Sequence, residues 1–202
     1  YSTFLQRGYD QINHDIARMQ GPVVVGIDRC GIIGEDGVSH QGIYDVSLLL
    51  PVPGIVLAQG KDVTESTRLL ATGFAAECPF LLRYSKNTIP EGEILPEPLP
   101  LGRWERLYPG QDITVITYGD FVAEAEEARA LLAHDGIEMG LVNARFLKPL
   151  DGEMLQTLLG EERPIVVYEE VARIGGLGSL VQQTAAEQQS RCPVHTLALP
   201  DE

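Results

Sequence analysis

Residues 22–42, PVVVGIDRCGIIGEDGVSHQG, join a short apolar run to a polar loop at 28–42 that contains four glycines. The apolar run is too short for a helix and rich in valine, which predicts a strand covered on both faces. Glycine loses more backbone freedom on folding than other residues, so ordering such a loop is costly. Open α/β sheets hold ligands where such strands end, which makes Arg29, Asp36 and His40 candidate ligand-binding residues. An ordinary polar connection between a strand and a helix is the alternative.

The rest of the chain alternates between helical and strand patterns. Leu5, Tyr9, Ile12, Ile16 and Met19 recur at helical spacing, which predicts one helix over 3–20. Short apolar runs predict further strands at 55–58, 80–84, 113–119, 139–145, 164–170 and 193–199, and amphipathic patterns predict helices at 62–76, 121–136, 151–160 and 178–189. This alternation predicts parallel sheets.

A proline-rich segment separates two such regions. Five prolines lie between positions 90 and 109, and they favour extended chain over helix. We therefore predict an incomplete first domain over 1–87, a linker over 88–111 and a second, smaller domain over 112–202. The fold class is α/β, with two parallel or mostly parallel sheets and helices on both faces. Trp104, the only tryptophan, is expected to pin the linker to a neighbouring domain.

Composition excludes several classes of function. The formal net charge of −14 would repel a nucleic-acid backbone, and no apolar stretch approaches the length of a membrane helix. Cys30, Cys78 and Cys192 form no CxxC pair, so the sequence encodes neither a disulfide framework nor a zinc site, and a cytoplasmic location is expected. Cys30 is interpreted as a small buried hydrophobe, with a nucleophilic role as the alternative. The absence of an initial Met and an abrupt end lead us to expect a fragment of a longer protein.

The segment EEVARIGGLGS at 169–179 places glycines between a strand and a helix. Backbone amides there could hold a phosphate, but the spacing of the glycines matches neither the dinucleotide fingerprint nor the P-loop. A tight turn with close helix packing is the preferred interpretation. Glu169 and Glu170 are adjacent in a strand, so they point to opposite faces and cannot act as a catalytic pair.

Four segments in this order resemble the 1-deoxy-D-xylulose-5-phosphate synthases, which are transketolase-like enzymes: YSTFLQRGYDQINHD (1–15), DRCGIIGEDGVSHQGIYDVSLL (28–49), NARFLKPLD (143–151) and EEVARIGGLGS (169–179). The resemblance implies the later part of a pyrimidine-binding domain followed by a transketolase C-terminal domain. It also implies an enzyme that uses thiamine diphosphate and Mg²⁺ to join pyruvate to glyceraldehyde 3-phosphate with loss of CO₂. This reaction would be the first step of the methylerythritol phosphate pathway to isoprenoids, and the product of the enzyme would also feed thiamine and pyridoxal synthesis. A cytoplasmic homodimer is expected.

The resemblance also assigns roles to residues at the start of the chain. Phe4 matches the residue that stacks on the aminopyrimidine of the cofactor, with core packing as the alternative. Tyr1 and Arg7 match residues that flank the same site, where Arg7 contacts cofactor or substrate and Tyr1 is a substrate-binding residue.

Further roles fall on the glycine-rich loop. Arg29 matches the arginine that binds the aldehyde's phosphate, for which its fork of N–H donors is suited; an ordinary surface ion pair is the alternative. Asp36 and His40 match the residues implied to act in catalysis, which contact the pyruvate-derived intermediate and the acceptor.

The sequence departs from the pattern of this family at two places and lacks part of it. RYSKN at 83–87 stands where the family has RYPRG, so Lys86 replaces a second phosphate-binding arginine, and weaker discrimination for the aldehyde is expected. AQGKD at 58–62 replaces an APSDE type of segment, as in a divergent or specialised synthase. The family's catalytic glutamate and its diphosphate and metal ligands would lie upstream of Tyr1. No metal ligands are therefore assigned within the chain, and the isolated chain is predicted to be inactive.

Two other interpretations remain. A transketolase or the β subunit of a 2-oxo acid dehydrogenase would share both domains, although GEDGVSHQG at 34–42 favours the synthase. A noncatalytic dimerisation or assembly module is the alternative from another class.

Overall fold

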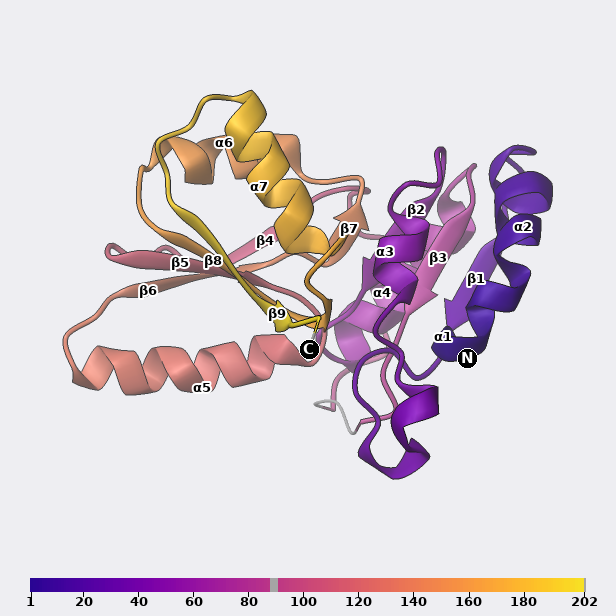
Figure 1. The fold of residues 1–202 in the computed structure, drawn as a ribbon, viewed down its shortest axis with the longest axis horizontal. Coiled ribbons are helices and arrows are strands. Elements are labelled where there is room, and N and C mark those ends of the chain that lie inside the picture. Colours follow the sequence, from indigo (N-terminus) through magenta and orange to yellow (C-terminus); the bar gives the residue numbers. More distant parts are fainter. Residues whose placement is uncertain (88–90, 202) are drawn as a thin grey trace.

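The computed structural model describes residues 1–87 and 91–201, which form two α/β units built on two sheets (Figure 1). The start of the predicted linker, 88–90, lies outside the described residues. Both sheets are mostly parallel and helices cover their faces, so the predicted fold class is confirmed.

The first sheet has the strand order β1-β3-β2-β7. Its strands are β1 (Val24–Ile27), β2 (Val56–Gln59), β3 (Phe80–Arg83) and β7 (Phe146–Lys148). The first three are mutually parallel, whereas β7 is antiparallel to β2 and comes from the part of the sequence that follows the linker. The second unit therefore completes the sheet of the first.

The second sheet has the order β4-β6-β5-β8-β9, with β4 antiparallel and the others parallel. Its strands are β4 (Glu105–Tyr108), β5 (Ile113–Thr117), β6 (Met139–Asn143), β8 (Ile165–Ala172) and β9 (Val194–Leu199). Helix α5 (Phe121–His134) lies on one face, and α6 (Gly152–Gly160) and α7 (Leu177–Glu187) lie on the other (Figure 1). The sequence did not predict β4, because it lies within the expected linker.

Trp104 anchors the segment before β4, as predicted. Its indole is almost fully buried, and its Nε1–H donates to the Phe146 carbonyl oxygen at 2.7 Å. The ring of Phe146 packs edge-on against Phe80 of β3 at a centroid distance of 6.4 Å. One hydrophobic core thus continues through both units, which fixes their relative position.

Two predictions about the first unit were wrong in detail. The helix expected over 3–20 is a series of short helical segments, α1 (Ser2–Leu5), η1 (Gln6–Gly8), α2 (Tyr9–Gln11) and η2 (Ile12–Ala17). Because the last of these ends at Ala17, Met19 is 74% exposed instead of continuing the apolar face. Strand β1 is not covered on both faces, because it is the edge strand of its sheet and Gly26 is exposed.

The register of the first sheet explains how distant loops meet. Ile27 at the end of β1 is paired with Arg83 at the end of β3 in a parallel ladder. The loop at 28–42 and the segment at 84–87 therefore leave the same edge of the sheet. Helices α3 (Asp45–Leu49) and α4 (Val63–Ala75) follow β1 and β2, and α4 packs on these strands. Among the described residues no helix combines the length and the hydrophobicity that a membrane span needs.

Candidate functional site

The glycine-rich loop after β1 is closed at its base, which we call the neck, by Gly31 and Gly42. Their backbones exchange two hydrogen bonds, of 2.9 and 2.8 Å. Gly31 has φ +85°, and a Cβ on Gly42 would lie 2.2 Å from the Arg29 carbonyl oxygen. Both positions therefore need glycine, for backbone conformation at one and for space at the other.

Gln41 braces the inside of the loop, a role that sequence reasoning missed. Its Oε1 accepts from the Ile33 N–H at 2.5 Å, and its Nε2 donates to the carbonyl oxygens of Ile33 and Gly37 at 2.9 and 2.8 Å. The amide side chain pairs the Ile33 N–H and adds a second hydrogen bond to each of the two carbonyl oxygens, which also accept from the backbone N–H groups of Asp36 and His40. The loop is thus an ordered platform for the side chains that it carries.

Asp36 is the centre of a charged network at the site. Its carboxylate accepts from the Tyr1 hydroxyl at 2.6 Å, from Arg29 Nη1 at 2.7 Å and from Lys86 Nζ at 3.4 Å. The Tyr1 hydrogen bond, followed by those of Arg29 and Lys86, lowers the pKa of Asp36 to about 2, against a smaller effect of desolvation. As arranged here, Asp36 accepts hydrogen bonds at neutral pH and has no proton to donate.

Both cations of this network also have further partners. Lys86 Nζ lies 3.1 Å from Glu35, a contact that the sequence did not predict, and Arg29 Nε lies 3.5 Å from Asp28. The Arg29 guanidinium stacks on the Tyr1 ring at 4.7 Å. An anion that binds Arg29 and Lys86 must therefore compete with carboxylates already in place.

The aromatic half of the site lies beside this network. The Phe4 ring is 4.9 Å from the Tyr1 ring and 5.3 Å from the His40 ring, measured between centroids. The Arg7 guanidinium lies 5.3 Å from the centre of the Phe4 ring. Phe4 is 40% exposed, so its ring is only partly buried within this chain.

All seven residues singled out from the sequence thus lie in one cluster: Tyr1, Phe4, Arg7, Arg29, Asp36, His40 and Lys86. They come from three segments, and the parallel register of β1 and β3 brings two of these together. The functions of the individual residues remain predictions.

A buried ion pair lies behind the loop. Arg83 donates from Nε and Nη2 to Asp45 at 2.8 and 3.1 Å, and both side chains are almost fully buried. The Cys30 thiol donates to the same carboxylate at 3.4 Å, and burial raises its pKa to about 12. Cys30 is therefore the buried residue that the sequence predicted, and an inert thiol. The only signal for the ion pair was a charge at the end of the apolar run FLLR, at 80–83.

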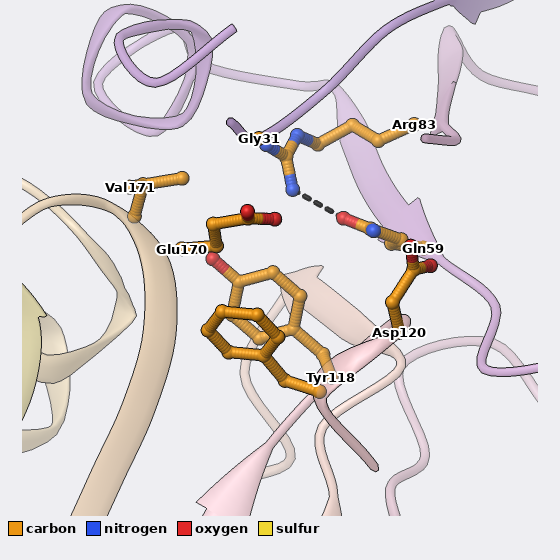
Figure 2. A pocket seen from close by; sticks show the side chains of 8 residues that line it. Gly31, Gln59, Arg83, Tyr118, Asp120, Glu170 and Val171 are labelled. Carbon is orange, nitrogen blue, oxygen red and sulfur yellow. Dashed lines mark hydrogen bonds between the residues drawn. The ribbon is translucent and has the colours of Figure 1, made fainter. Parts of the chain in front are cut away.

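A small cavity of about 10 Å³ separates this ion pair from the second unit (Figure 2). It is lined by residues of both units, namely Gly31, Gln59, Arg83, Tyr118, Asp120, Phe121, Glu170 and Val171. Its volume suits about one water molecule. The cavity is too small to bind a substrate. Its lining residues therefore belong to the contact between the two units behind the site.

Glu169 and Glu170 point to opposite faces of β8, as predicted. Glu169 accepts from the backbone N–H groups of Leu177 and Gly178 at 2.8 and 2.9 Å and from the Tyr118 hydroxyl at 3.2 Å. The amides at the start of α7 that could have held a phosphate are thus occupied by a carboxylate of the chain itself. The glycine segment forms a turn, with φ +78° at Gly175.

No group of three or more His, Cys, Asp or Glu side chains suited to a metal ion is present in residues 1–87 and 91–201. The location of a Mg²⁺ site outside this chain remains a prediction.

Comparison with known proteins places this site in context. The chain is similar to 1-deoxy-D-xylulose-5-phosphate synthases from Heliobacterium modesticaldum and Desulforudis audaxviator, with 42% and 43% identity over 100% of this chain and 32% of each relative. The enzyme of the same name from Listeria monocytogenes is 38% identical over 100% of this chain and 34% of its own length. The chain therefore spans about a third of the length of these relatives.

Solved structures share the fold. A structure described as a split gene transketolase in an inactive beta4 tetramer aligns with a TM-score of 0.89 and 28% identity, over 100% of this chain and 65% of that one. A transketolase mutant from Pichia stipitis aligns with a TM-score of 0.72 over 98% of this chain and 28% of that one, and at 19% identity this likeness concerns the fold alone.

Family models account for both units. The model described as the pyrimidine-binding domain of transketolase matches residues 1–91. The model described as the transketolase C-terminal domain matches residues 102–202. The chain belongs to the transketolase family, and its sequence matches the pyrimidine-binding and C-terminal domains of that family.

Proposed function

We propose that the chain is part of a 1-deoxy-D-xylulose-5-phosphate synthase, which condenses pyruvate with glyceraldehyde 3-phosphate and releases CO₂. The observation that carries this proposal is the convergence of Phe4, His40 and Arg29 with Asp36 and Lys86 at one edge of the sheet. Such a site offers an aromatic surface, a titratable ring and two cations to one small anionic substrate. The relatives compared above bear the name 1-deoxy-D-xylulose-5-phosphate synthase.

The residues present suit the pyrimidine half of thiamine diphosphate. Phe4 offers a partly exposed ring, with His40 at its edge and Arg7 over it. When bound, the cofactor would supply the electron sink that decarboxylation of a 2-oxo acid requires. The chain's own part is to hold the aromatic ring of the cofactor and to exclude water from one side of it.

The charged half of the site suits the phosphorylated acceptor. Arg29 can pair two phosphate oxygens at once, whereas Lys86 contributes a point charge. A phosphate would compete for both with Asp36, which lies 2.7 Å from Arg29 and 3.4 Å from Lys86. His40 is then placed to give a proton to, or take one from, the oxygen of the acceptor's carbonyl group.

The remainder of the machinery is proposed to lie outside these residues. This includes the acid that activates the aminopyrimidine, the diphosphate site and the Mg²⁺ ligands. The isolated chain is therefore expected to bind ligands but not to turn over. A homodimer in the cytoplasm is part of the same proposal.

The test uses the complete protein that contains this chain, supplied with thiamine diphosphate and Mg²⁺. We expect CO₂ release that requires both pyruvate and glyceraldehyde 3-phosphate. Arg29→Gln should raise KM for the aldehyde and leave that for pyruvate nearly unchanged, because only the aldehyde carries a phosphate. Arg18→Gln is the matched control, since Arg18 is exposed and its side chain hydrogen-bonds to His14, away from the cluster. Turnover of a ketose phosphate donor in place of pyruvate would instead identify a transketolase.

A further inference from the structure

The neck of the loop rests on the end of β8 in the second unit. Beside the neck, the Ala172 N–H donates to the Ile43 carbonyl oxygen at 3.0 Å. A Cβ on Gly175 would lie 2.9 Å from the Cβ of Ser47, so the chain after β8 also packs closely against the start of α3. The loop that carries Arg29 and Asp36 is thus supported by a unit to which it does not belong.

Glu170 of β8 packs against Gly31 of the neck. Its side chain points into the cavity between the units, toward Gly31 and the Arg83–Gln59 pair (Figure 2). A Cβ on Gly31 would lie 2.1 Å from Glu170 Oε2. The carboxyl group therefore occupies the space that a side chain at Gly31 would take, and it fixes where the neck can lie.

We propose that Glu170 is a positioning residue that acts through the neck at Gly31 to set Arg29 and Asp36 relative to Phe4 and Lys86. It is not one of the seven residues of the cluster, and its role would be exercised through its packing against Gly31. The expected effect of Glu170 on catalysis rests on the proposed function. Its expected effect on the order of the loop does not.

The surroundings of Glu170 make this support sensitive to pH. Burial, followed by the charges of Asp120 and Glu124, raises its pKa to about 7, although the Ile32 amide and the Arg83 guanidinium favour the charged form. Below that pH the neutral carboxyl group fits the cavity. Above it, a desolvated charge faces two other acids, and the contact with the neck weakens.

The first test is hydrogen exchange in the 202-residue chain, on the hydrogen-bonded amides of Gly31, Ile33 and Gly42. Glu170→Ala should speed their exchange by about tenfold relative to intrinsic rates, because the support is removed. Glu170→Gln keeps the shape and should retain protection. Glu187→Gln, an exposed acid on α7 whose partner is Gln183, is the matched control. Amides of β5 and β6 should be unchanged, which shows that the fold persists.

The effect of the negative charge of Glu170 is tested separately with Glu170→Gln. This test does not require the Glu170→Ala variant to fold. Between pH 6 and pH 8 the exchange of the loop amides in the wild-type chain should accelerate by more than the intrinsic exchange rate does. In Glu170→Gln it should not. Loop protection that is unaffected by Glu170→Ala in a chain with native β5 and β6, or a pH response that is the same in Glu170→Gln, overturns the proposal.

The kinetic test uses the complete synthase and separates this inference from the proposed function. Glu170→Ala should raise KM for glyceraldehyde 3-phosphate by about tenfold with kcat changed much less, and Glu170→Gln should restore KM. Equal KM values in the three proteins would contradict positioning. Absence of synthase activity in the wild-type protein would reject the proposed function instead, while the exchange measurements still decide the role of Glu170.

Discussion

The Tyr1 hydroxyl donates a 2.6 Å hydrogen bond to Asp36, which lies 35 residues further along the chain. This bond joins the first helical segment to the glycine-rich loop and places Asp36 between the two cations of the site. Asp36 thereby forms ion pairs with both Arg29 and Lys86, at 2.7 and 3.4 Å. The carboxylate and an incoming phosphate are competitors for the same two side chains.

Asp36→Asn should therefore strengthen the binding of inorganic phosphate to the chain by several-fold at pH 7. The pKa of Asp36 is about 2, so the substitution removes a full negative charge at that pH. Titration followed by NMR of the Arg29 and Lys86 side chains measures the effect. Asp10→Asn is the matched control, because Asp10 is exposed and pairs with His14. Weaker phosphate binding in Asp36→Asn would show that Asp36 organises the cations and does not compete for them.

Lys86→Arg should increase the preference of the complete synthase for a phosphorylated acceptor. A guanidinium can donate two parallel hydrogen bonds to phosphate, whereas the ammonium group of lysine offers a point charge. We expect a lower KM for glyceraldehyde 3-phosphate and an unchanged KM for glyceraldehyde. Lys61→Arg serves as the control, since Lys61 pairs with Glu105 away from the site. A fall in KM for both aldehydes would indicate a general effect on the loop.

The sequence predicted most of the strands because they depend on local patterns, and it predicted the site residues because their segments resemble those of a known family. Alternating apolar and amphipathic segments located both sheets, and the segments around Phe4, Arg29 and Lys86 indicated one site. It did not predict β4 or the pairing of β7 with β2, because those contacts are long-range and the segments carry no strand pattern of their own. The support of the loop by Glu170 was missed for the same reason.

Asp45→Asn should destabilise the chain by about 3–5 kcal/mol, since it leaves the charge of Arg83 buried without its partner. Urea unfolding followed by the fluorescence of Trp104 measures the loss. Adding Arg83→Met to Asp45→Asn should recover part of the stability, because no unpaired charge then remains. Glu153→Gln is the matched control, because Glu153 forms an exposed pair with Arg103 and little change is expected. A similarly small change in Asp45→Asn would mean that water reaches Arg83.

The pH dependence of stability provides a test of the environment of Glu170. Its pKa is raised to about 7 in the folded chain, so folding disfavours its charged form. The corresponding stability is fully present below the pKa of the unfolded chain, near pH 4.5, and is lost as the pH rises through about 7. After allowance for the part of the side chain that solvent reaches, the loss is about 1–2 kcal/mol.

Glu170→Gln should therefore be nearly as stable as the wild-type chain at pH 5 and more stable at pH 8, because the amide cannot acquire the desolvated charge. Urea unfolding at the two pH values measures both differences. Glu169 also has a pKa raised by burial, but it is present in both proteins and cancels in the comparison. Glu187→Gln should have the same stability as the wild-type chain at both pH values. A Glu170→Gln variant that is less stable than the wild type at pH 8 would mean that the charged carboxylate is well paired there, and that the neck is held by charge and not by shape.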